Sequence, residues 1–79
     1  MTGYYIGTLH DAEGLVKVCS KFDEDIDVIY QKQVIDAKSI LGVASLMGHT
    51  VSLNVITDDN DVKEKLEREI QKEMGNYEI

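Results

Sequence analysis

The chain has 79 residues, of which 15 are acidic and 8 basic, so its formal net charge at pH 7 is −7. This length leaves room for one domain, and we expect residues 1–79 to form it. The acidic excess repels phosphate backbones and anionic lipid, which argues against nucleic acid and membrane surfaces as partners. No apolar run is long enough to span a bilayer, so we expect no membrane insertion and a cytoplasmic location.

The chain offers few residues for a disulfide, a metal or a cofactor. The single cysteine, Cys19, cannot form an internal disulfide, and no metal-ligand spacing surrounds it. We therefore expect a reducing compartment, a thiol that fills the core, and neither a metal nor a cofactor.

The first third of the chain predicts a strand followed by a helix. Imperfect alternation favours a strand over Thr2 to Thr8. Helical spacing then places apolar side chains on one side of a helix from about His10 to Phe22. Thr8 and Asp11 have the spacing of a capped helix start.

The middle of the chain predicts two strands and a short helix. Ile26 begins an alternating strand, and Val34 with Ile35 continues the pattern beyond a polar turn, which indicates a hairpin that lacks an Asn-Gly pair. A very apolar helix then begins at Lys38 or Ser39 and ends at Gly48.

The last third predicts a strand and a final helix. Alternation is clearest over Val51 to Ile56, and a helix follows the acidic residues Asp58 to Asp61 and carries a narrow apolar stripe to Met74. His49 is expected in the turn before the strand. Half-polar strands suit a sheet with one wet face, so we predict an α+β, open-faced β-sandwich of order β-α-β-β-α-β-α, with a four-stranded antiparallel sheet and three helices on one face.

One segment has a specific resemblance. Residues 37–48 read A-K-S-I-L-G-V-A-S-L-M-G, with Val34-Ile35-Asp36 before them and the strand from Val51 after them. This stretch resembles the regulatory-serine region of HPr, the small phosphocarrier family of the bacterial sugar phosphotransferase system. The similarity extends from Tyr4 to about Met74, and it implies the same element order and an HPr-like fold.

The active-site pattern of that family is missing from this chain. HPr proteins place a histidine at the cap of the first helix, an arginine two residues later and then a proline. Alignment without gaps puts Thr8 at the histidine position, His10 at the arginine position and Asp11 at the proline position. A shifted alignment makes His10 the phosphoryl acceptor, but Ala12 then stands at the arginine position.

Ser39 matches the serine that a dedicated kinase phosphorylates in HPr proteins of low-GC Gram-positive bacteria. The resemblance implies that Ile40, Leu41 and Val43, together with Thr8, form an interaction surface for a regulator such as the catabolite control protein. A structural role remains open, with Ser39 satisfying a first-turn N–H and the apolar residues filling the core.

The sequence and its resemblance to HPr leave three hypotheses for the function. The first is a regulatory or adaptor protein that has lost phosphocarrier chemistry and binds phosphotransferase proteins or a transcriptional regulator; it is not an enzyme. The second is a divergent phosphocarrier, a phosphotransfer intermediate that accepts a phosphoryl group from Enzyme I on His10. The third is a small α+β subunit unrelated to sugar transport. Oligomeric state does not follow from length or charge.

Overall fold

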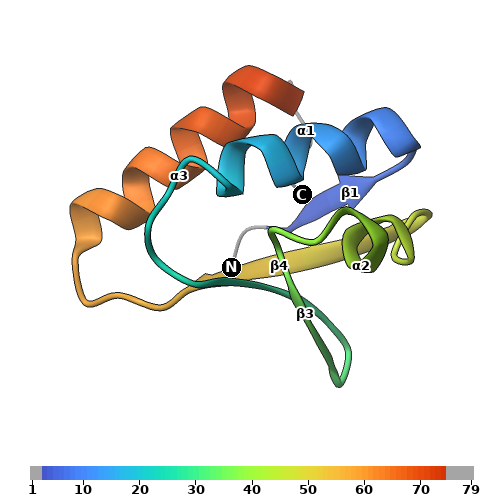
Figure 1. The fold of residues 1–79 in the computed structure, drawn as a ribbon, viewed down its shortest axis with the longest axis horizontal. Coiled ribbons are helices and arrows are strands. Elements are labelled where there is room, and N and C mark those ends of the chain that lie inside the picture. Colours follow the sequence, from blue (N-terminus) through green and yellow to red (C-terminus); the bar gives the residue numbers. More distant parts are fainter. Residues whose placement is uncertain (1–2, 75–79) are drawn as a thin grey trace.

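The computed structural model describes residues 3–74 as a four-stranded sheet and three helices (Figure 1). In chain order the elements are β1 (Tyr4–Ile6), α1 (Leu9–Cys19), β2 (Ile26–Tyr30), β3 (Gln33–Asp36), α2 (Ile40–Ala44), β4 (His49–Val55) and α3 (Asn60–Met74). The strands are antiparallel and lie in the order β1-β4-β2-β3. The predicted fold class and element order are confirmed.

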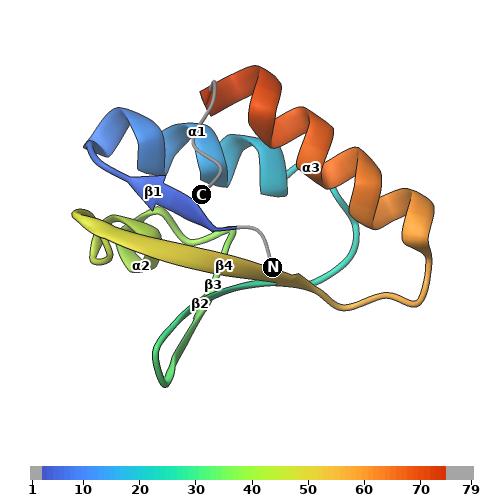
Figure 2. The same cartoon turned by 180° about the vertical axis from the view of Figure 1, so that it is seen from behind.

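The helices lie on one face of the sheet, with α1 and α3 side by side and the short α2 at one end (Figures 1 and 2). This arrangement follows from the strands, in which alternate side chains face the helices. Tyr4 and Ile6 of β1 are buried, as are Ile26 and Val28 of β2, whereas the residues between them are more exposed. The opposite face of the sheet carries no helix within residues 3–74.

The core lies between the sheet and the helices. Each element contributes apolar side chains, and together they form one cluster. Its largest fully buried members are Ile6, Leu15, Ile26, Leu46, Ile70, Val18, Val28, Val43, Val51 and Cys19. Leu66, Ile70 and Met74 of α3 are buried, which confirms the predicted apolar stripe of that helix.

Two glycines have distinct roles around α2. A Cβ atom at Gly42 would lie 2.6 Å from Cγ2 of Ile35, so only glycine permits this approach of α2 to β3. Gly48 has a φ of +88°, and its N–H donates to the carbonyl of Ile6 at 2.6 Å. This bond joins the chain after α2 to the end of β1.

The structure corrects several predicted boundaries. Helix α2 ends at Ala44 rather than at Gly48, because Leu46 N and Met47 N donate to carbonyls only three residues back, as in a tighter turn. The helix α1 ends at Cys19 rather than at Phe22. His49 belongs to β4 and is not a turn residue; its ring contacts that of Tyr30, with centroids 4.4 Å apart.

The hairpin between β2 and β3 forms despite its weak turn sequence. Tyr30 pairs with Gln33, which leaves a two-residue loop in which Gln31 adopts a φ of 54°. A left-handed residue in such a loop matches the twist of the strands. Thr2, predicted to begin the first strand, lies outside the described residues, as do 75–79 of the predicted domain.

Candidate functional site

The beginning of α1 is closed by a reciprocal pair of side chains. Thr8 is the N-cap, and its Oγ1 accepts from Asp11 N at 3.1 Å. The Asp11 Oδ2 accepts from Gly7 N at 3.0 Å and from Thr8 N at 3.1 Å. The predicted capping by Thr8 and Asp11 is thereby confirmed, and both partners of a capping box are present.

The Asp11 carboxylate matters for the chemistry of this helix start. A helix N-terminus attracts anions because its N–H groups lack partners within the helix. Here a carboxylate of the chain itself already accepts two of the N–H groups that precede the helix, and Asp11 is only 8% exposed. An incoming phosphate would meet a fixed negative charge, and the amides of Gly7 and Thr8 are already bonded.

His10 does not occupy the capping position. It is the second residue of α1 and is exposed, whereas Thr8 holds the position that receives the cap. The geometry therefore agrees with the alignment without gaps, in which Thr8 stands where HPr proteins have their histidine. The chain contains one arginine, Arg68, and it lies in α3.

Ser39 lies at the beginning of α2 and acts as its N-cap. Its Oγ accepts from Gly42 N at 3.3 Å, and the side chain is half-buried. The preceding Lys38 does not turn toward Ser39. Its Nζ donates to the carbonyl of Phe22 at 2.7 Å, which ties the loop before α2 to the segment after α1.

The apolar residues after Ser39 divide between the surface and the core. Leu41 is 83% exposed and Ile40 is 39% exposed. Val43 is fully buried, so its assignment to the interaction surface is wrong: it faces the core and contributes packing rather than contact area. A five-residue helix that is apolar all round gives no periodicity from which its buried side could be deduced.

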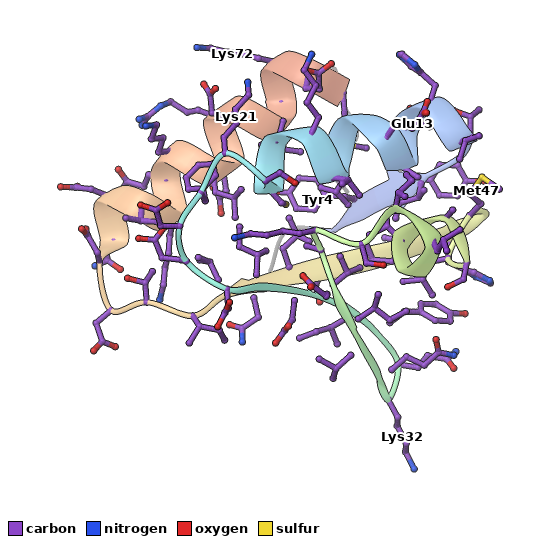
Figure 3. The ribbon with its side chains drawn as sticks, viewed as in Figure 1. Tyr4, Glu13, Lys21, Lys32, Met47 and Lys72 are labelled. Atoms are coloured by element: carbon purple, nitrogen blue, oxygen red, sulfur yellow. The ribbon has the colours of Figure 1, made fainter. Side chains whose placement is uncertain are left out.

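Two exposed apolar residues were not predicted for this surface. Leu9 directly follows the N-cap of α1 and is 51% exposed, and Met47 is 43% exposed just after α2, where Figure 3 shows it at the edge of the molecule. The end of β1 that leads into α1 and the helix α2 lie at the same end of the molecule in both views (Figures 1 and 2). We refer to Leu9, Ile40, Leu41 and Met47 as the apolar end surface. Leu9 had a signal in the sequence, because it falls outside the helical stripe of buried residues.

The thiol of Cys19 has a structural role. Cys19 is buried, as predicted, and burial raises the pKa of its thiol from 9.0 to about 12. No three His, Cys, Asp or Glu side chains of the described residues gather in a way that could hold a metal ion. None of the helices in this part of the chain has the length and apolar character needed to cross a bilayer.

Comparison with known proteins agrees with this arrangement. A family model described as the PTS HPr component phosphorylation site matches residues 9–72. HPr-C-His from Thermoanaerobacter tengcongensis is 29% identical, with a TM-score of 0.68 over 94% of this chain and 93% of that chain. An HPr dimer from the same organism is 30% identical, with a TM-score of 0.65 over 85% and 82% of the two chains. The catabolite repression containing protein Crh of Bacillus subtilis, described as a swapped dimer, is 27% identical, with a TM-score of 0.64 over 89% and 85%.

Proposed function

The chain belongs to the HPr family of the phosphotransferase system, and from that premise we propose that it is a regulatory or adaptor member that binds protein partners and does not carry phosphoryl groups. One observation carries this proposal. The carboxylate of Asp11 accepts the N–H groups of Gly7 and Thr8 directly before α1, at the helix start where the family uses a phosphohistidine and an arginine. A residue that supplies negative charge at this point opposes a dianionic phosphoryl group.

The binding surface of this proposal is the apolar end surface together with Ser39. Leu9 and Leu41 expose large apolar side chains beside two helix starts, and such exposed groups favour protein contacts. Phosphorylation of Ser39 would add about 1.5 to 2 negative charges next to Ile40 and Leu41, and would thereby change which partner binds. We propose a transcriptional regulator of the catabolite-control type, or a protein of the phosphotransferase system, as that partner, in the cytoplasm of a bacterium.

A phosphotransfer assay tests the proposal. The protein is incubated with phosphoenolpyruvate, Enzyme I and Mg²⁺, and intact mass spectrometry before and after acid treatment detects phosphohistidine. The chain has two histidines, so His10→Ala has a matched control in His49→Ala. We expect no acid-labile phosphate on the wild type, whereas an HPr phosphocarrier in the same reaction is fully labelled. A phosphate that disappears with His10→Ala and persists with His49→Ala would overturn the proposal.

A second assay addresses the regulatory surface. The HPr kinase and ATP are added to the wild type, to Ser39→Ala and to the control Ser45→Ala, whose hydroxyl donates to the Gly42 carbonyl and lies on the exposed side of α2. We expect an acid-stable phosphate on the wild type and the control only. Binding of the phosphorylated protein to the regulator should weaken with Leu41→Ala. Equal labelling of all three proteins would refute the assignment of Ser39.

The alternative function is a divergent phosphocarrier that uses His10. It is favoured by the exposure of this imidazole at the second position of α1, where Enzyme I can reach it. The phosphotransfer assay separates the two functions, because only a phosphocarrier forms phosphohistidine.

A further inference from the structure

The strand β3 leaves one edge of the sheet open. In the order β1-β4-β2-β3 it is the last strand, and it pairs only with β2 among the described residues. The hairpin extends away from α1 and α3 in both views (Figures 1 and 2). An edge strand presents backbone N–H and C=O groups that can pair with another strand.

The outward groups of β3 can be identified from the ladder. Ala37 N donates to the carbonyl of Ile26 at 2.9 Å, so these two residues form a hydrogen-bonded pair. Hydrogen-bonded and non-hydrogen-bonded pairs alternate along an antiparallel ladder. Ile35 therefore directs its backbone groups to β2, whereas Val34 and Asp36 direct theirs to the open edge. The carbonyl of Asp36 accepts from Ser39 N at 3.1 Å.

The side chains beside these groups are exposed, and Asp36 is charged. Val34 is 64% exposed on the face of the sheet that carries no helix. Asp36 lies directly opposite Asp27 in the ladder, and two like charges in such a pair repel each other. Lys32 projects from the hairpin tip away from the domain (Figure 3), and it forms no ion pair with any described residue.

We propose that the β3 edge pairs with the β3 edge of a second copy of this chain, antiparallel, with Val34 opposite Val34 of that copy. This register uses the outward N–H and C=O of Val34 for two symmetric hydrogen bonds. It also brings Lys32, in the loop just before β3, close to Asp36 of the other copy, which ends the strand.

The identity of the occupant rests on this charge complementarity. In the two-fold arrangement both lysines meet a carboxylate, and each lysine also approaches the repelling Asp27 and Asp36 pair. Lysines at a sheet edge ordinarily discourage pairing with other strands, and Lys32 lies in the loop that leads into this edge. Here Lys32 favours a partner strand whose far end carries an acidic residue, and Asp36 of a second copy meets that condition. The net charge of −7 on each copy opposes association, so the dimer forms only at high protein concentration.

The test measures self-association by sedimentation velocity from about 20 μM to about 1 mM, a range suited to weak complexes. Val34→Pro removes the outward N–H, which the protein's own sheet does not use, and proline is compatible with an edge strand. We expect the wild type and the control Val34→Thr to show a concentration-dependent dimer, and Val34→Pro to remain monomeric. A wild type that stays monomeric throughout would overturn the proposal, as would a dimer that survives Val34→Pro.

A charge exchange tests the register itself and does not depend on proline. Lys32→Glu alone places two acidic residues opposite each other, and Asp36→Lys alone places two lysines opposite each other, so each should dimerise about tenfold more weakly than the wild type. An equimolar mixture of the two variants restores both attractive pairs and should associate more strongly than either alone. Thermal unfolding by circular dichroism confirms that each variant is folded. A mixture no stronger than its components would reject this register.

Discussion

The capping box at α1 predicts a graded loss of stability. Thr8→Ala removes the hydrogen bond that Asp11 N donates to Oγ1 at 3.1 Å and should cost about 1 kcal/mol of unfolding free energy. Asp11→Ala removes two charge-assisted bonds, at 3.0 and 3.1 Å. Because Gly7 and Thr8 are exposed, water replaces part of this interaction, and we expect a cost of about 2 kcal/mol.

The assay is urea unfolding monitored by circular dichroism, with thermal melting as a second measurement. For a domain of this size each kcal/mol corresponds to a fall in Tm of roughly 4–8 °C. Asp11→Asn keeps an acceptor oxygen and loses the charge, so its unfolding free energy should lie between those of Asp11→Ala and the wild type. Glu13→Ala is the control, since Glu13 points away from the sheet on the exposed side of α1 (Figure 3). If Thr8→Ala and Asp11→Ala both lie within about 0.5 kcal/mol of the wild type, the box does not hold the helix start.

Three further predictions concern the core and the α2 region. Val43→Ala should destabilise the protein by about 1–3 kcal/mol, whereas Leu41→Ala should change the unfolding free energy by less than about 0.5 kcal/mol; equal effects would contradict the burial of Val43 and the exposure of Leu41. Gly42→Ala should cost about 1–3 kcal/mol in urea unfolding, because its Cβ would lie 2.6 Å from Ile35, and a neutral result would mean that α2 shifts without cost. The Cys19 thiol, with its pKa raised by burial to about 12, should resist Ellman's reagent in the folded protein at pH 8 and react at once in urea. Rapid labelling of the native protein would refute the burial of this thiol. Because the folded protein keeps the thiol protonated, the associated contribution to the unfolding free energy is complete below pH 9 and is lost as the pH rises from 9 through 12.

Local signals predicted much of this fold correctly. The capping of α1 depends on two side chains three residues apart, and Thr8 and Asp11 carry that information by themselves. The buried stripe of α3 could also be predicted from the sequence, because its apolar residues keep a spacing of four over several turns. Both features involve residues whose partners lie close in sequence.

Features that depend on tertiary packing could not be predicted from the sequence. The burial of Val43 beside the exposure of Leu41 depends on how α2 contacts Ile35, and that contact requires Gly42. His49 joins β4 because the strand continues into its pairing with β1, opposite Ile6. In both cases the deciding neighbour is distant in the chain, which local periodicity does not encode.

The candidate site divides in the same way. The absence of an arginine near His10 was visible in the sequence, and so was the serine that begins α2. The role of Asp11 as an acceptor for Gly7 N and Thr8 N required the structure, because it depends on the direction of one carboxylate. The central claim about the protein is that the Asp11 carboxylate occupies the amides to which a phosphate would otherwise bind.

Titration of ¹⁵N-labelled protein with inorganic phosphate tests that claim most directly, with chloride at equal ionic strength as the control. The amide signals of Gly7 and Thr8 report on the groups that Asp11 now accepts. We expect these signals to remain unchanged in the wild type and to shift saturably in Asp11→Ala, where the amides become free and the negative charge is removed. Saturable shifts of both signals in the wild type would contradict the account, because phosphate would then bind despite the carboxylate.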